Sequence, residues 1–491
     1  SDTSISSPGV QNPGTPPGGG GGGGGGQTTI DLIPSGGCGT GSIREASVTN
    51  GDITINACEI TGNITGNTTI APNAGVIITG PVFVGQDDGP AAQTGNGNGL
   101  SAGGVPVTLT IGAGATLFGA SGSDYLVVTR GSRIEANGTI DSPIIMTSRS
   151  DIEGTVGENE KGQWGGLVIN GRAPINACTD GNATGGTVDC EKSGEGASGL
   201  FGGDNAADSS GVLNYLQVRY AGFKVNNEDE LNGIAFQGVG SGTEVDYIQV
   251  HNNSDDGIEM FGGAVDLRHV VLTGNDDDSM DYTDGWRGRA QFVLVRQGPS
   301  GDQGFEFDNR GGTGDANDLE PRSNPMISNF TLIGNRNGSG SNDSDQGMLI
   351  REGTAGQLFN GIVVDFGDDC IDVDQAATYA RIGAADDFLD IQSVVLDCVS
   401  NFDESAGEVP QGFSSLEEWF LSRPNNAVIS NTLTGTPFFS GQTGPVPGQV
   451  ESGLTAIDVN AIDSWFVEAD YVGAVEDAND TWYLGWTFIP Q

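Results

Sequence analysis

Paired carboxylates recur along this sequence, and they are the residues best suited to chemistry. The segment GDDCIDVD, residues 367–374, carries one such pair in Asp368 and Asp369. Two carboxyl groups can act as the acid and the base of glycoside hydrolysis when they lie about 6.5–9.5 Å apart. Carboxylate oxygens are also the preferred ligands of Ca²⁺. The pair therefore has two chemical interpretations, a catalytic site and a cation site.

Four other segments align with this one, namely SDDGIEM, DDDSMDY, GDQGFEF and SDQGMLI. The first aspartate is common to all five segments, at Asp255, Asp277, Asp302, Asp345 and Asp368. A second column reads Asp256, Asp278, Gln303, Gln346 and Asp369, and a third reads Glu259, Asp281, Glu306, Leu349 and Asp372. Recurrence in five segments indicates a repeating structural unit and argues against a single active site.

The repeat has the length of one solenoid coil. Asp277 follows Asp255 by 22 residues, and Asp302 follows Asp277 by 25. Each unit is a short apolar strand, a turn of Asn, Gly and Asp, and a second strand with alternating apolar residues. Because crossovers between parallel strands are right-handed, we expect an all-β, right-handed parallel β-helix over residues 27–400.

Stacking places equivalent carboxylates about 4.8 Å apart, where they repel one another. Bound Ca²⁺, capping by backbone N–H groups of the turns, or protonation could each relieve this repulsion. Capping is the purely structural explanation, and it is compatible with a bound cation. The densest cluster is GNDDDSMDYTDGW, residues 274–286. The candidate Ca²⁺ ligands are Asp255, Asp256, Asp276, Asp277, Asp278, Asp281, Asp302, Asp368 and Asp369.

The aspartate pairs resemble the catalytic pair of polygalacturonase-type glycoside hydrolases, which are parallel β-helices. Those enzymes also carry a histidine and a basic motif after the pair. Here the two histidines, His251 and His269, both precede Asp368, so we assign no catalytic residue. A pectate-lyase type of reaction would need a basic side chain beside Ca²⁺-binding carboxylates. The arginines near the acidic turns are Arg287, Arg289, Arg296 and Arg310.

Composition restricts the partners and the compartment. The 491 residues include 65 acidic and 19 basic ones, for a formal net charge of −46. Such a chain lacks the basic patches that bind nucleic acid, and no apolar run is long enough to span a membrane. Six cysteines form three sequence-local pairs, Cys38/Cys58, Cys178/Cys190 and Cys370/Cys398, which predicts disulfides and an extracellular location.

Three further regions differ from the repeats. Residues 1–26 are of low complexity and end in nine glycines, which indicates a tether or an assembly element. Long polar loops interrupt the coils near residues 150–163 and 177–211. We expect residues 401–491 to cap the C-terminal end, with a short helix begun by a capping box of Ser414 and Glu417. The aromatic tail, which carries Trp465, Trp482 and Trp486, should cover the last coil.

Several long motifs identify a family. GQWGGLVINGRAPIN, GVLNYLQVRYAG, ELNGIAFQGVGSGTEVDYIQV and DDGIEMFGGAVDLRHVVLTGNDDDSMDYTDGW occur in this order. They resemble a widespread family of secreted or surface-anchored bacterial proteins, common in Bacteroidota and marine proteobacteria. The resemblance implies a parallel β-helix at the outer cell surface, and it implies no particular reaction.

We therefore expect an extracellular, non-enzymatic surface protein, structural or adhesive, with Ca²⁺ bound by the stacked Asp turns. Its partners would be other copies of itself or other cell-surface components, and self-assembly stays open. One alternative is a polysaccharide-active hydrolase or lyase. Another is a surface lipoprotein, anchored upstream of Ser1, that captures a ligand for an outer-membrane receptor.

Overall fold

The structure is a computed structural model that describes residues 26–91, 104–226, 229–312, 314–335, 346–404, 407–430, 454–477 and 479–489. The tail of residues 1–26 lies, apart from Gly26, outside these ranges, and so does Asp345.

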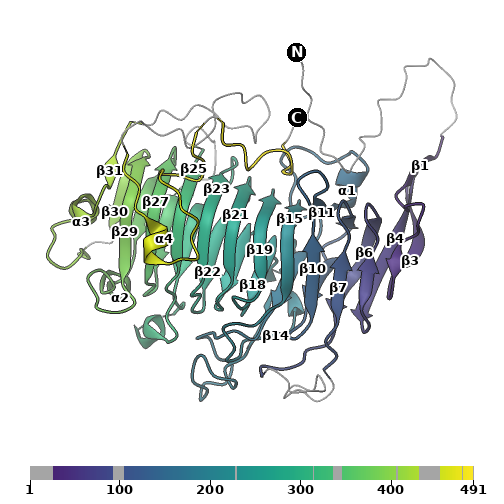
Figure 1. Ribbon diagram of the computed structural model, residues 1–491, viewed down its shortest axis with the longest axis horizontal. Coiled ribbons are helices and arrows are strands. Elements are labelled where there is room, and N and C mark those ends of the chain that lie inside the picture. Colours follow the sequence, from purple (N-terminus) through teal and green to yellow (C-terminus); the bar gives the residue numbers. More distant parts are fainter. Residues whose placement is uncertain are drawn as a thin grey trace, which may run out of the picture.

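Within the described ranges, 27 strands join into one continuous sheet that coils into a parallel β-helix (Figure 1). The first strands are β1 (Thr28–Asp31), β2 (Gly39–Thr40), β3 (Arg44–Asn50), β4 (Ile53–Ile64), β5 (Thr68–Ile70), β6 (Gly75–Val84), β7 (Thr108–Ile111), β8 (Thr116–Gly119), β9 (Tyr125–Val128), β10 (Arg133–Asn137) and β11 (Ile144–Ser148). Only β2 and β3 among the named strands of this sheet pair antiparallel, with β5 and β4. The predicted all-β fold is confirmed.

The later coils repeat two strand series. The longer strands are β15 (Gly211–Arg219), β19 (Glu244–His251), β21 (Asp266–Thr273), β23 (Arg289–Arg296), β25 (Met326–Ile333), β27 (Gly356–Val364) and β29 (Leu389–Asp397). The shorter ones are β12 (Gly166–Asn170), β18 (Ile234–Gln237), β20 (Ile258–Phe261), β22 (Met280–Thr283), β24 (Gln303–Asp308), β26 (Gln346–Arg351), β28 (Asp369–Val373) and β30 (Ser400–Glu404). Within each series successive strands pair in parallel, so equivalent residues stack into columns.

The longer strands bend at a left-handed residue. The bend positions are Tyr215, Tyr247, His269, Phe292, Asn329, Asn360 and Ser393, with φ between 48° and 60°. A left-handed conformation costs a non-glycine residue roughly 1–2 kcal/mol. Ring stacking offsets part of this cost, since the centroids of Tyr215 and Tyr247 lie 4.4 Å apart and those of Tyr247 and His269 lie 4.2 Å apart.

Three disulfides join the predicted cysteine pairs Cys38–Cys58, Cys178–Cys190 and Cys370–Cys398. The second closes the polar loop of residues 177–211. This loop holds the small elements β13 (Lys192–Ser193), η1 (Glu195–Ala197) and β14 (Leu200–Phe201), and the hairpin of β16 (Lys224–Asn226) and β17 (Asp229–Glu230) follows β15. The described helices are all too short or too polar to cross a membrane.

A short helix closes the C-terminal end of the coil. In α3 (Leu416–Ser422), Leu416, Trp419 and Phe420 are buried and join the main hydrophobic core. The capping residue is Ser415, whose hydroxyl accepts from the N–H of Glu418, one residue later than the predicted pair of Ser414 and Glu417. The last strand of the coil, β31 (Ala427–Val428), pairs in parallel with β29. The remaining elements outside the coil are α1 (Arg149–Ile152), η2 (Gly314–Asp318), α2 (Ala376–Tyr379) and α4 (Val459–Ile462).

The aromatic tail does not cover the last coil as expected. Residues 454–477 and 479–489, here called the C-terminal strap, run back along the flank of the longer strands (yellow in Figure 1). The hydroxyl of Ser393 in β29 donates to the carbonyl of Thr455 (2.8 Å), and the amide of Gln249 in β19 donates to that of Phe488 (3.0 Å). The strap therefore crosses coil after coil, and α3 covers the end instead.

Candidate metal centre

A column of acidic side chains lies on the outward face of three successive short strands. Glu259 of β20, Asp281 of β22 and Glu306 of β24 are direct neighbours in register. Because side chains alternate along a strand, residues such as Ile258 and Met260 point into the core and the acids point outward. The predicted third column is confirmed, and beyond Glu306 it continues with Leu349 and Asp372.

The turns before these strands add a second set of acids. The side chain of Asp256 accepts from the backbone N–H of Asp278 (3.0 Å), and that of Asp278 accepts from the N–H of Gln303 (2.9 Å). Each carboxylate thus caps the backbone of the following coil through its Oδ1 atom. Backbone capping, one of the three expected remedies for repulsion, operates at these two positions and leaves the second oxygen of each carboxylate for other partners.

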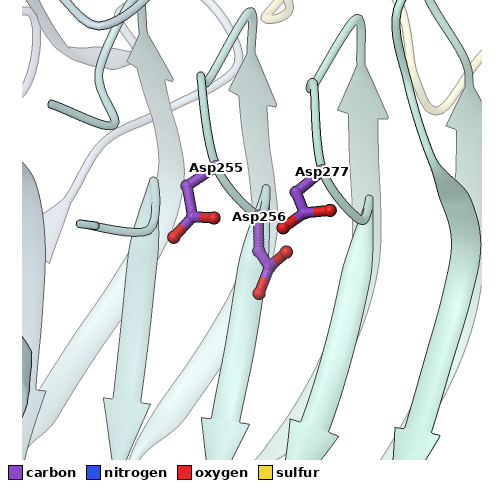
Figure 2. Close-up of side chains that lie close together, drawn as sticks. All are labelled: Asp255, Asp256 and Asp277. Atoms are coloured by element: carbon purple, nitrogen blue, oxygen red, sulfur yellow. The ribbon is translucent and has the colours of Figure 1, made fainter. Parts of the chain in front are cut away.

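Figure 2 shows Asp255, Asp256 and Asp277 converging from two successive turns. One oxygen from each lies within 4.8 Å of the others. Burial, together with the charge of Asp277, raises the pKa of Asp255 to about 7. The charge of Asp277 thus disfavours ionisation of Asp255.

Two more acidic groups continue along the column. Asp256, Glu259 and Asp281 form one, and Asp278, Asp281 and Glu306 form the other, each with oxygens within 4.8 Å of one another. We call the seven carboxyl residues of the three groups the acidic cluster: Asp255, Asp256, Glu259, Asp277, Asp278, Asp281 and Glu306.

Asp281 is the member of the cluster with a buried oxygen that has no hydrogen-bonding partner among the described residues. Its side chain is buried, with a relative exposure of 7%, and no donor in the described residues reaches its Oδ1 atom. Glu259, by contrast, accepts from the amide of Asn232 at 2.7 Å. A buried carboxylate oxygen without a donor is costly unless a proton or a metal ion compensates it.

Burial controls the protonation of the cluster. It raises the pKa of Asp256, Glu259, Asp278 and Asp281 well above the ordinary range, because the charged form loses hydration and the neighbouring carboxylates add repulsion. Burial and the charge of Asp308 raise the pKa of Glu306 to about 8. Without a cation the cluster retains protons at neutral pH, and a divalent cation would displace them.

The basic side chains around the cluster are already engaged. Arg351 pairs with Glu306 (3.0 Å) and with Asp308 (2.9 Å). Burial lowers the pKa of Arg351, but the ion pairs with Glu306 and Asp308 raise it by a larger amount. Arg351 therefore stays protonated and is unsuited to act as a base. The four arginines considered for lyase chemistry contact other groups: Arg287 contacts Asp387, Arg289 contacts Asp266 and Asp463, Arg296 contacts the Gly334 carbonyl, and Arg310 contacts Asp284.

The structure brings together only part of the predicted ligand set. Asp276 points away from the cluster and bonds to Lys161 and Ser300. Asp302, Asp368 and Asp369 belong to none of the three acidic groups in the described residues. Glu259 and Glu306 are the members that the predicted set omitted. Both lie in the third column, at the strand position equivalent to Asp281. This position could have identified them as candidate ligands from the sequence.

The spacing of the carboxyls also bears on catalysis. An inverting glycosidase needs an acid and a base about 6.5–9.5 Å apart, with room for a water molecule. Asp255 and Asp277, neighbours in the first column, have oxygens within 4.8 Å of each other.

The sequence also has a match among protein families. A family model for a pectate-lyase-like β-helix domain matches residues 98–429, which include every coil that contributes to the acidic cluster. No curated protein matches the chain. Since this match covers more than half of the sequence and agrees with the observed coil, the protein belongs to the family of pectate-lyase-like β-helix domains.

Proposed function

We propose that this protein is an extracellular, non-enzymatic β-helix scaffold whose acidic cluster binds Ca²⁺. The observation that carries the proposal is Asp281, a buried carboxylate between Glu259 and Glu306 whose Oδ1 has no donor among the described residues. A cation at this position would supply the missing partner. It would also compensate the repulsion within the column.

The donor set favours calcium over other metals. The cluster offers carboxylate oxygens, with no histidine or cysteine in the three acidic groups of the described chain, which disfavours zinc. Ca²⁺ accepts six to eight oxygen ligands in irregular geometry, whereas Mg²⁺ retains several waters and needs an octahedral site. Four of the seven cluster residues, Asp256, Glu259, Asp278 and Asp281, are buried and leave little space for retained water.

The role of the cation would be to connect coils. Residues of the acidic cluster come from three successive coils, so a bound ion would link neighbouring coils in addition to the sheet and the Asp256 and Asp278 caps. The three disulfides support an oxidising compartment such as the cell surface. A rigid coil stabilised by disulfides and a bound cation suits a structural or adhesive surface component.

Calcium titration of the full chain tests the proposal. We expect binding by calorimetry, and a stabilisation of about 2.7 kcal/mol when free Ca²⁺ is one hundred times its Kd. Asp281→Asn should abolish most of both effects. Asp141→Asn, a change at an exposed aspartate outside the cluster, serves as the control and should preserve them. Absence of Ca²⁺ binding by the wild-type protein would refute the proposal.

The family match favours a second candidate, a polysaccharide-active enzyme. In that case the acidic cluster would hold the cation that bridges an anionic polysaccharide to the protein. Purified protein would be incubated with a panel of neutral and acidic polysaccharides in the presence of Ca²⁺. Release of reducing ends or unsaturated products, lost in Asp281→Asn and retained in Asp141→Asn, would replace the non-enzymatic proposal with this one.

A further inference from the structure

Asp281 belongs to two acidic groups at once. It completes the group of Asp256 and Glu259 on one side and the group of Asp278 and Glu306 on the other. The register explains this, since Asp281 is the middle residue of the column and faces Glu259 in the preceding coil and Glu306 in the following one. Its two carboxylate oxygens can therefore serve different partners.

One cation cannot use both groups. Glu259 and Glu306 are two coils apart, which places their backbones about 9–10 Å from each other. Ca²⁺ binds oxygens at about 2.3–2.6 Å, so two ligands on opposite sides of one ion are separated by about 5 Å. In agreement, the oxygens of Glu259 and Glu306 do not fall within one group of the described residues, although each is grouped with Asp281.

The charge of the column also exceeds what one cation balances. The two groups contain five different carboxyl residues: Asp256, Glu259, Asp278, Asp281 and Glu306. Arg351 compensates Glu306 at one end of the column only. Two divalent cations would balance four of the five charges, and a carboxylate placed between the ions would reduce their mutual repulsion.

We propose that the acidic cluster holds two divalent cations bridged by Asp281, one bound with Asp256 and Glu259 and the other with Asp278 and Glu306. This inference rests on the proposed function, because it takes the cluster to be a cation site. It adds the number of ions and the division of the ligands between them. The ions would form a short row parallel to the long axis of the coil.

Counting bound ions in matched variants tests the bridge. Full-length protein is saturated with Ca²⁺, and bound ions are counted by native mass spectrometry and by calorimetry. We expect Glu259→Gln and Glu306→Gln each to lose one ion relative to wild type, and the double variant to lose two. Asp281→Asn should weaken both sites by at least tenfold. Far-UV circular dichroism confirms that each variant keeps its β structure.

The outcomes separate the two proposals. If either glutamate variant loses all bound calcium, or if neither loses any, the two-ion arrangement is wrong while cation binding stands. If wild-type protein binds no calcium at all, the proposed function fails and the bridge fails with it. A loss of one ion in each single variant and of two in the double variant supports the bridge.

Discussion

The acidic cluster and the surface under the C-terminal strap lie on two outer faces of the same coil, and each presents polar side chains from several coils. Under the strap these side chains include Gln249, Gln291 and Asn360. Each amide donates to the carbonyl and accepts from the N–H of one strap residue, which is Phe488, Val467 and Ile457 respectively. The amides therefore pair with the strap as a neighbouring strand would.

The acidic cluster has no such complement. A carboxylate only accepts hydrogen bonds, so a stack of carboxylates cannot satisfy itself or pair with both groups of a backbone. Asp256 and Asp278 use the N–H groups of the next turn, but the Oδ1 atom of Asp281 has no donor in the described chain. The comparison shows that polar side chains buried on an outer face of the coil need a partner of matching chemistry, which is the strap on one face and a proton or a cation on the other.

The largest effect that would test the comparison is expected under the strap. Trp486 is 1% exposed and packs edge-on against Tyr215 and Tyr247. Trp486→Ala should lower the free energy of unfolding by about 3–5 kcal/mol, since it removes a large buried side chain. Urea unfolding followed by fluorescence measures this. The loss of stability should be the same with and without Ca²⁺, because the strap and the acidic cluster lie on different faces. If Ca²⁺ restored the lost stability, the two faces would not be independent.

The next effect concerns pH. The carboxyl pKa values of Asp255 (about 7) and Glu306 (about 8) lie above the ordinary values of about 4. The folded protein thus holds protons that the unfolded chain releases, so the contribution of these two groups to stability is greatest below about pH 4 and is lost as pH rises from about 4 through 7 and 8. In EDTA, the urea midpoint should fall between pH 5.5 and 8.5, and Ca²⁺ should reduce the fall.

A matched variant separates this effect from general repulsion among the many acidic residues. Glu306→Gln removes one of the groups that titrate in this range, so its urea midpoint in EDTA should depend less on pH than that of the wild type. Equal pH dependence of the two proteins would show that Glu306 does not contribute.

A smaller effect follows from changing one amide under the strap into an acid. Asn360→Asp keeps the acceptor for the N–H of Ile457 (2.7 Å) but removes the donor to its carbonyl (3.0 Å). The cost should be about 1–3 kcal/mol, because a partly buried carbonyl loses its partner. Asn50→Asp, at an exposed position, is the control for the added charge and should cost less. Similar costs for the two variants would contradict the bidentate pairing.

The smallest effect is expected at Asp368, which occupies the same motif position as Asp255. Asp368 is exposed and belongs to none of the acidic groups of the described residues. Asp368→Asn should change stability by less than about 0.5 kcal/mol. Its calcium-binding isotherm should overlay that of the wild type. A reduced number of bound ions would mean that the cation sites extend to this coil.

The sequence was sufficient to predict much of the fold. The recurrence of apolar strands and Asp-rich turns predicts a parallel coil, and the spacing of the cysteines predicts the three disulfides. It also places Glu259, Asp281 and Glu306 in one column. The sequence does not show which members of the columns converge, since Asp276 and Asp277 are adjacent in the chain and yet face different partners.

The strap shows the same limit over a longer range. The aromatic composition of the tail predicts that the tail covers apolar surface. Which surface it covers depends on contacts between residues hundreds of positions apart, such as Gln249 and Phe488. Local patterns carry no information on such pairings. The end of the coil is closed instead by α3, whose three buried apolar residues pack against the main hydrophobic core.

The sequence by itself thus determined the repeating unit of this protein, because strand alternation and turn residues act over a few neighbouring positions and repeat in every coil. The tertiary structure decided which of the repeated carboxylates become a site. Among the described residues, burial and register bring acidic side chains together on the coils of Glu259, Asp281 and Glu306. The free energy of a buried charge depends on all its neighbours in space, and the stacking of the coils supplies those neighbours.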